Sequence, residues 1–402
     1  MSRLPRIISV DDHVVEPPDL WSSRLPSRLQ DGGPHVRRER GTIVESLRGR
    51  WSPNRDEGAW ADVWYFDDMV RPLQRGLAQS GFEDEDNTRP VTFDELLPGT
   101  YQRDARLVDM DRNHTEVSIC YPSISRFCGQ MFLERQDKAL ALLCLQIYND
   151  WMIDEWCGPE RPARLVPLTL VPLWDADLAA AEVRRCAAKG SHATSFPECP
   201  PALGLPSIFS DYWDPFFTAC EETDTVLNIH VGSSPTMTTA PDAPLDEAIC
   251  FFFVNSQLAF TDWLYSGVLE DFRQLRIVLA EGQVGWMPFV LQRIDNTWKK
   301  AVGRNISTGR RARELPSTSM PGRVFGAIFD DLQGLINRDD VGIEHILIET
   351  DFPHQDSSYP DSEKAVAELV SGAGLNEKET RQLVRENAVT VFGLDTHFGI
   401  SV

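Results

Sequence analysis

Imidazole and carboxylate side chains stand at or just after the ends of several apolar, strand-like runs of this chain. The runs are RIISV (6–10), TVLNIH (225–230), RIVLAE (276–281) and HILIE (345–349), and the polar residues are Asp11, His13, His230, Glu281, Asp351 and His354. Buried together, such groups would repel and desolvate one another unless a cation paired with them. Imidazoles with several carboxylates, and no thiolate, suit Zn²⁺, Fe²⁺ or Mn²⁺ better than Ca²⁺. The sequence therefore predicts one divalent metal ion.

The chemistry expected of such a centre is activation of water or of an acidic substrate. A catalytic metal site keeps one coordination position open and lowers the pKa of bound water towards about 7. A carboxylate beside that water can take its proton, and Asp351 is our candidate general base. His354 follows shortly after Asp351 and either assists catalysis or stabilises the turn.

These residues need a scaffold that brings distant segments to one place. Strand-like runs alternate with long segments that repeat apolar residues every three or four positions, as helices packed on a sheet do. The alternation predicts a parallel sheet, specifically a (β/α)8 barrel, whose active site forms at the carboxyl ends of the strands. The other strand-like runs are EVSICY (116–121), LVPLTLV (165–171), HATSF (192–196) and RVFGAIF (323–329), and the main helical segments span 137–156, 176–190, 255–272 and 362–375.

Residues 20 to about 110 interrupt this alternation. The segment is rich in Arg, Asp, Gly and Pro, and we expect a long insertion after strand one that folds over one face of a single barrel domain spanning 1–402. Its aromatic residues either form an apolar lid for an aromatic or polycyclic substrate or make a small core of the insertion itself, which we favour. These residues are Trp21, Trp51, Trp60, Trp64 and Phe66.

Composition narrows the classes of partner. The formal net charge is −22, so the surface repels phosphate backbones and anionic lipid, and we expect neither nucleic acid nor a membrane as a partner. The N-terminal segment does not read as a secretory signal, and no apolar run is long enough to cross a bilayer. The eight cysteines show no CxxC pair, which is typical of reduced, mostly buried thiols and predicts a cytoplasmic protein.

Several motifs resemble one known superfamily. They are SVDDHVVEPPDLW (9–21), CYPS (120–123), YNDW (148–151), LAEGQVGWMPFVLQRID (279–295) and ETDFPHQDS (349–357). Through them the chain resembles the amidohydrolase superfamily, in its amidohydrolase-related branch of aminocarboxymuconate-semialdehyde and resorcylate-type decarboxylases. The resemblance implies a (β/α)8 barrel with a mononuclear metal bound by Asp11, His13, His230 and Asp351, and by analogy a possible homodimer.

Two positions depart from the pattern of that superfamily. Val15 replaces the second histidine of the first motif, so Asp11 must supply the extra ligand from strand one. Glu281 stands where many relatives have a histidine, and it could orient the strand-five ligand, bind the metal or act on the substrate. Glu16 either forms a hydrogen bond to one of the metal-binding side chains without binding the metal itself, or caps the following segment.

Three functions are compatible with these residues. We favour a metal-dependent hydrolase, in which metal-activated water attacks the acyl carbon of an amide, lactone, ester or thioester in a small organic substrate. The alternative is a non-oxidative decarboxylase of an aromatic or unsaturated carboxylic acid, which needs the same metal and an acid. Catalytic roles fall in either case to Asp351, His354 and Glu281. The third hypothesis is a non-catalytic binding protein on a barrel fold.

Overall fold

A computed structural model describes residues 4–45, 50–54, 56–83, 86–234, 239–240, 242–301 and 309–401. Its central element is a parallel eight-stranded sheet in the order β1-β6-β7-β8-β9-β10-β11-β12. The two ends of this sheet are joined by backbone hydrogen bonds from Asp351 N–H to Asp11 O (3.0 Å) and from His13 N–H to Phe352 O (2.7 Å). The predicted (β/α)8 barrel is confirmed. Its strands are β1 (Ile7–Val14), β6 (Thr115–Pro122), β7 (Leu165–Thr169), β8 (Ala193–Ser195), β9 (Val226–His230), β10 (Ile277–Ala280), β11 (Val324–Ile328) and β12 (Ile346–Ile348).

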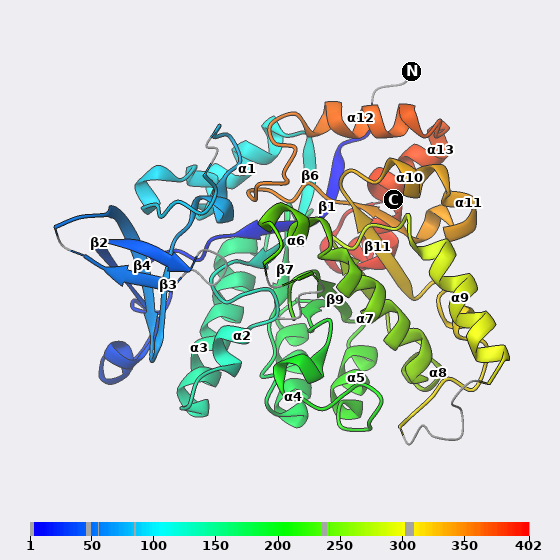
Figure 1. The fold of residues 1–402 in the computed structure, drawn as a ribbon, viewed down its shortest axis with the longest axis horizontal. Helices are drawn as coiled ribbons and strands as arrows, with labels where there is room; N and C mark the ends of the chain where they lie inside the picture. Colours follow the sequence, from blue (N-terminus) through cyan, green and yellow to red (C-terminus); the bar gives the residue numbers. More distant parts are fainter. Residues whose placement is uncertain are drawn as a thin grey trace.

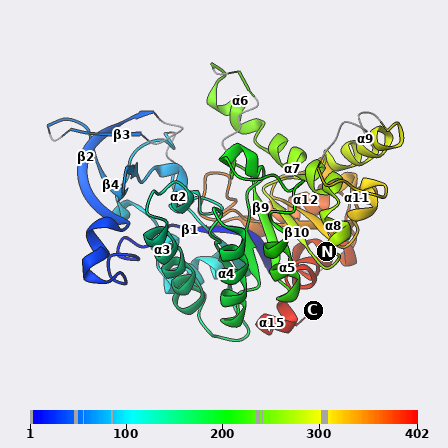
Figure 2. The same ribbon diagram turned by 90° about the horizontal axis from the view of Figure 1, so that it is seen from below.

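Helices follow most of these strands and surround the barrel, as Figures 1 and 2 show. The predicted segment 137–156 forms a helix that continues into a π-helical turn, Met152–Cys157. The helices of the first half are α1 (Arg103–Arg112), α2 (Gln130–Leu133), α3 (Lys138–Trp151), α4 (Ala176–Ala188), α5 (Asp214–Glu222) and α6 (Leu245–Cys250). Those of the second half are α7 (Phe253–Ser266), α8 (Val268–Asp271), α9 (Met287–Lys299), α10 (Leu332–Ile336), α11 (Arg338–Val341), α12 (Ser362–Gly372), α13 (Glu377–Arg381), α14 (Asn387–Val391) and α15 (Leu394–Phe398).

Burial explains why the strand runs are apolar. The strands of a parallel barrel are covered by helices outside and by packed side chains inside, so both faces need apolar residues. All eight residues of β1 are buried, although three of them are ionisable. The strand is also longer than the run 6–10 predicted, because Asp12, His13 and Val14 continue the pairing with β6 after an irregularity that contains Asp11. Polar groups inside a buried strand require partners, which the site supplies.

A second, antiparallel sheet lies to one side of the barrel, at the left of Figures 1 and 2. Its order is β3-β2-β4-β5, and it belongs to the long insertion after the first strand. Helix α1 begins at Arg103, inside the range 20–110 that we assigned to the insertion. The exact limits of the insertion and the single-domain organisation stay predictions. The strands of this sheet are β2 (His35–Glu45), β3 (Arg50–Pro53), β4 (Ala59–Phe66) and β5 (Met69–Pro72).

The aromatic residues of the insertion occupy three different environments. Trp64 and Trp21 are buried and pack edge to face with centroids 5.3 Å apart, in a core shared with barrel residues. Trp51 belongs to a small cluster inside the second sheet, whereas Trp60 is 56% exposed. None of these tryptophans lines the cavity of the candidate site.

Among the described residues, no helix combines the length and the apolar character needed to cross a bilayer. All eight cysteines lie in the described part of the chain and are free thiols, and most of them are buried.

Candidate active site and metal centre

Strand β1 carries two of the predicted ligands on one face. Successive side chains of a strand point to opposite faces, so Asp11 and His13 lie together and Asp12 lies on the other side. The Asp12 carboxylate accepts hydrogen bonds from Ser9 Oγ (3.0 Å) and Thr350 Oγ1 (2.7 Å). These bonds join β1 to the segment after β12, and Asp12 therefore has a structural role beside the centre.

His13 lies in the middle of the cluster of predicted ligands. Its Nε2 atom is 3.1 Å from His230 Nε2, 3.2 Å from Asp11 Oδ1 and 3.5 Å from Asp351 Oδ1. His230 Nε2 is 3.2 Å from the other Asp11 oxygen. Three distant segments of the chain thus place these four side chains around one small volume.

The backbone is held in the left-handed region at two of the acidic residues. Glu281 follows β10 with a φ of 54°, and Asp351 follows β12 with a φ of 49°. Such conformations cost non-glycine residues about 1–3 kcal/mol and persist where the surroundings enforce them, often at functional sites. Here Asp351 N–H donates to Asp11 O (3.0 Å), and Glu281 N–H donates to a Glu349 carboxylate oxygen (3.2 Å). These bonds fix the strained turns beside the cluster.

Glu281 and His354 complete the cluster. Glu281 Oε1 is 3.7 Å from His230 Nε2, and the Glu281 side chain is hydrogen-bonded to Asp351. His354 Nδ1 is 2.9 Å from Asp351 Oδ1, and its ring stacks on His13 with centroids 3.7 Å apart. Glu281 and His354 each offer a possible ligand atom within 4.8 Å of ligand atoms of His13 and Asp351. Each is therefore placed to bind a cation or to act on a substrate.

Burial dominates the electrostatics of the cluster. Desolvation raises the pKa of Asp11 well above its ordinary value, and the nearby Glu349 carboxylate raises that pKa further. Burial lowers the pKa of His13 well below its ordinary value and that of His230 to about 3. Both imidazoles are consequently neutral near pH 7, which is the form that coordinates metal ions.

The donor atoms fit a divalent cation. Both Asp11 oxygens are buried without a hydrogen-bond donor. A buried carboxylate normally pairs with a donor or a cation, and here it faces two neutral imidazole nitrogens instead. Asp11, His13, His230 and Glu281 offer ligand atoms within 4.8 Å of one another, a spacing that ligands around a single ion can adopt. His13, Glu281, Asp351 and His354 form a second such set, so the two sets share His13 and Glu281 and Asp351 belongs to the second only. The set contains nitrogen and oxygen only, as predicted for Zn²⁺, Fe²⁺ or Mn²⁺.

Three residues near the centre were missed from the sequence. Phe127 stacks on His230 with centroids 3.9 Å apart and an interplanar angle of 7°. The Tyr121 ring lies 5.1 Å from the same imidazole. Glu349 is buried beside Asp11 and Glu281. Glu349 ends the run HILIE and could have been found by the same rule as Glu281, whereas Phe127 lies in a loop without a spacing signal.

Glu16 has a role that differs from either expectation. Its carboxylate accepts hydrogen bonds from the backbone N–H groups of Ser123, Ile124 and Ser125, at 2.8–3.2 Å. Glu16 therefore holds the loop after β6, and this loop carries Phe127 to its place against His230.

A cavity of about 310 Å³ opens onto the cluster. Glu281, Asp351 and His354 line it on the barrel side, and Phe127 forms part of an apolar wall. Other lining residues come from the insertion, around Leu77. The centre is thus accessible to a small molecule, and the insertion helps to shape the space that this molecule would occupy.

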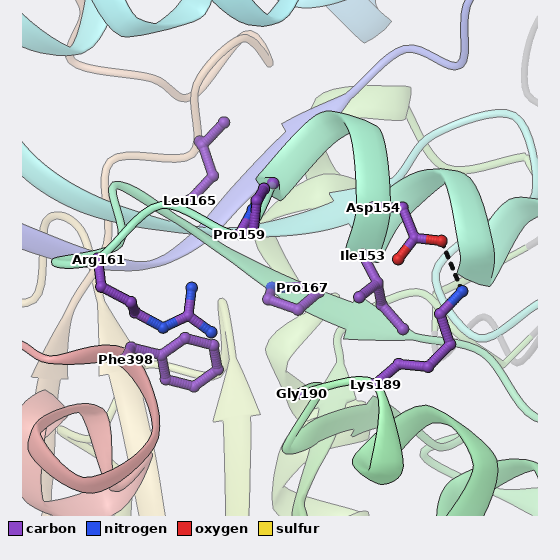
Figure 3. Close-up of a pocket in the computed structure, with 10 residues that line it drawn as sticks. Ile153, Asp154, Pro159, Arg161, Leu165, Pro167, Lys189, Gly190 and Phe398 are labelled. Atoms are coloured by element: carbon purple, nitrogen blue, oxygen red, sulfur yellow. Dashed lines mark hydrogen bonds and ion pairs between the residues drawn. The ribbon is translucent and has the colours of Figure 1, made fainter.

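A second hollow of about 370 Å³ lies elsewhere and contains none of the predicted site residues (Figure 3). Leu165 and Pro167 line it at the beginning of β7, whereas the cluster lies at the carboxyl ends of the strands. Lys189 at its edge is paired with Asp154 at 2.6 Å. The candidate chemistry belongs to the first cavity.

The fold and the cluster together define a (β/α)8-barrel protein with a candidate metal centre at the carboxyl ends of its strands. The family described as Amidohydrolase matches residues 95–394, and the chain belongs to this family. The resemblance noted in the sequence is therefore confirmed, and with it the assignment to an enzyme superfamily.

Individual relatives are more distant. The chain is 26% identical over 334 residues to gamma-resorcylate decarboxylase of Rhodococcus jostii (strain RHA1), covering 75% of this chain and 93% of that protein. An amidohydrolase structure from Mycobacterium avium subsp. paratuberculosis K-10 superposes with a TM-score of 0.72 and 21% identity, over 97% of this chain and 99% of that one. The structure of a 5-carboxyvanillate decarboxylase from Novosphingobium aromaticivorans DSM 12444 was solved with manganese and a nitrobenzoic acid. It superposes with a TM-score of 0.57 and 19% identity, over 72% of this chain and 79% of that one.

The structural similarities and the named relative support different conclusions about this protein. The structural neighbours share the fold at low identity. The Rhodococcus jostii relative is named a decarboxylase, which favours the decarboxylase alternative over the hydrolase that we preferred from the sequence.

Proposed function

We propose that this protein is a metal-dependent, non-oxidative decarboxylase of an aromatic carboxylic acid. The observation that carries the proposal is the cluster in which His13 Nε2 lies within 3.5 Å of His230, Asp11 and Asp351, at the edge of a cavity of about 310 Å³. The named decarboxylases among the relatives support the reaction type, and the manganese in one of them supports the cofactor.

Asp11, His13, His230 and Asp351 would hold the metal, and Glu281 is close enough to join them. When bound, a divalent cation would anchor the substrate carboxylate and an adjacent hydroxyl oxygen and withdraw electrons from them. Neutral imidazoles and an ionised Asp11 carboxylate are the ligand forms that this role requires.

The chain's own residues would position the ring and supply the proton. Phe127 presents an apolar surface to the cavity and would pack against the substrate ring. Asp351, which also lines the cavity, would deliver a proton to the ring carbon that bears the carboxylate. Its neighbour His354, 2.9 Å away, would fix the orientation of the donating carboxyl group. Glu281 shares a hydrogen bond with Asp351, so a proton can be held between these two carboxylates.

The reaction balances with one proton. The new C–H bond forms at the ring carbon, the C–C bond to the carboxylate breaks, and its electron pair restores the aromatic ring as carbon dioxide leaves. Asp351 is left as a carboxylate and regains its proton from solvent, for which His354 provides a path at the cavity wall. No oxidant or reductant is needed.

One pair of assays separates the proposed reaction from hydrolysis. Protein reconstituted with Mn²⁺ is given 2-hydroxybenzoates, and carbon dioxide release is measured; in parallel it is given amide, lactone, ester and thioester substrates, and acid or thiol release is measured. We expect carbon dioxide release only. Hydrolysis without carbon dioxide release would overturn the proposal in favour of the hydrolase. Bound metal without either reaction would favour the non-catalytic binding protein.

A further inference from the structure

The described residues that the insertion contributes to the wall of the active-site cavity are mostly polar, and none of them is charged. Gln74, Asn87 and Thr88 line it there, and Gln355 meets them from the segment after β12. Asn87 Nδ2 donates a hydrogen bond to Gln355 Oε1, and Gln74 Nε2 donates one to Thr88 O (3.2 Å). This part of the wall is therefore a connected set of amides and a hydroxyl, able both to donate and to accept hydrogen bonds.

This polar wall is fixed to the segment that carries His354. Ser80 N–H donates to Pro353 O (3.0 Å), and Ser80 Oγ donates to His354 O (3.3 Å). Gly76 N–H donates to Asn87 O (2.6 Å), which joins the two insertion stretches that line the cavity. The amides consequently have defined positions relative to the reactive cluster.

The ionisable side chains among the described lining residues are three carboxylates and one imidazole, that of His354. Glu281, Asp351 and Asp356 are the carboxylates, and among the described lining residues there is no Lys or Arg. The rest of the wall is apolar and suits the faces and edge of an aromatic ring. Its members are Leu77, Phe127, Val231, Ile249 and Phe252.

Arginines adjacent in sequence to lining residues are engaged elsewhere. Arg75 is buried and donates to Ala78 O (3.3 Å). Arg89 pairs with Glu95 at 2.9 Å, and Arg126 pairs with Glu134 at 2.9 Å. None of the three lines the cavity.

We propose that the substrate is an aromatic acid with a single carboxylate, and that Gln74, Asn87 and Thr88 select a neutral, hydrogen-bonding substituent on the rest of its ring. This inference rests on the proposed function, because the carboxylate is the group that faces the metal centre. A second carboxylate would enter a wall without a cation and would share the cavity with Asp356, so it would be desolvated and repelled. An amide or hydroxyl in the same place exchanges hydrogen bonds with the wall.

Three probes of similar shape test this selection. They are 2,6-dihydroxybenzoates that carry a carboxamide, a carboxylate or an aminomethyl group opposite the first carboxylate. Binding to the Mn²⁺-reconstituted protein is measured by stopped flow from the fluorescence of the hydroxybenzoate ring, on a timescale shorter than one turnover. We expect the carboxamide to bind at least about 10-fold tighter than the dicarboxylate. Equal or tighter binding of the dicarboxylate overturns the inference, and so does tighter binding of the cationic probe.

A matched pair of variants locates the selection at the insertion. Gln74→Arg adds a cation that can still donate to Thr88 O, and we expect it to reduce the preference for the carboxamide about 10-fold or to reverse it. Gln74→Met, of similar length and neutral, should not recruit the dicarboxylate. If both variants change the preference equally, the charge argument is wrong.

The two proposals fail in distinguishable ways. If the carboxamide probe binds selectively but no 2-hydroxybenzoate releases carbon dioxide, the proposed decarboxylase activity is wrong and the proposed substrate selectivity is retained. If monocarboxylates and dicarboxylates release carbon dioxide with equal kcat/KM, the proposed selectivity is wrong and the decarboxylase activity is confirmed. If none of the three probes binds, the substrate class is wrong.

Discussion

Replacing Asp11 with Asn should change the stability of the metal-free and the metal-bound protein in opposite directions. The substitution keeps the shape of a fully buried side chain and removes its charge. In the metal-free protein burial and the neighbouring Glu349 and Glu281 carboxylates raise the pKa of Asp11. A raised carboxyl pKa means that stability is present at low pH and is lost as pH rises above the ordinary value of 3.8. Near pH 7 the metal-free Asp11→Asn variant should therefore melt at a higher temperature than the unmodified protein.

The stabilisation that metal binding adds should be smaller in the Asp11→Asn variant than in the unmodified protein. A ligand at about 100 times its Kd stabilises the folded state by about 2.7 kcal/mol. For a chain of 402 residues, an unfolding entropy of about 2.1 cal/mol/K per residue converts this energy into a rise of about 3 °C in Tm. Asp11 lies 3.2 Å from both His13 and His230, so its charge acts on the whole ligand set. A loss of about 100-fold in metal affinity reduces the rise to about 0.5 °C.

The assay is calorimetric melting after chelation and again after titration with Mn²⁺. Asp12→Asn is the matched control, because Asp12 is the adjacent buried carboxylate and accepts hydrogen bonds from Ser9, Ser118 and Thr350. We expect that control to lose about 1–3 kcal/mol of stability and to keep its response to metal. An undiminished metal-induced rise in the Asp11→Asn variant would refute the assignment of Asp11 to the centre.

Three other perturbations give separate tests. Asp351→Asn should lower turnover by at least about 10²–10⁴-fold with the fold retained in circular dichroism, because the proton-carrying carboxyl is lost; near-normal activity would remove Asp351 from the mechanism. His230→Ala should lower the metal content measured by plasma emission spectrometry, and unchanged occupancy would show that the ligand assignment is wrong. Burial raises the pKa of Glu198 to about 8, so the folded protein keeps a proton that the unfolded chain releases above about 4.5. The free energy of unfolding should fall by about 1.4 kcal/mol per pH unit through that window, and Glu198→Gln should abolish this part of the slope in pH-dependent denaturation; identical pH profiles would contradict it.

The barrel could be predicted because its signal is local and repeated. Each strand-like run is apolar since both faces of a parallel strand are covered, and each helical segment has its own periodicity. A β-strand of the structure overlaps each of the predicted runs, and β9 ends at His230 as expected. The rule that active sites form at the carboxyl ends of barrel strands then selected the residues of the cluster.

Contacts made by loop residues could not be predicted from the sequence. Phe127 lies against His230 in a loop that Glu16 holds through the backbone N–H of Ile124, and Glu16, Phe127 and His230 belong to distant parts of the chain. Likewise, the positions of Asn87 and Gln355 in the sequence do not predict that their side chains are hydrogen-bonded to each other. The insertion appeared as a change of composition, whereas its part in the cavity wall depends on tertiary packing. The type of reaction was equally beyond reach, because hydrolysis and decarboxylation use the same ligands.

The most direct test of the central claim is a crystal structure grown with Mn²⁺, with the metal located by anomalous scattering. Our account predicts one strong peak at about 2.2 Å from side-chain atoms of Asp11, His13, His230 and Asp351. Crystals that contain manganese but show no peak between these four residues would contradict the shared cation and, with it, the proposed chemistry.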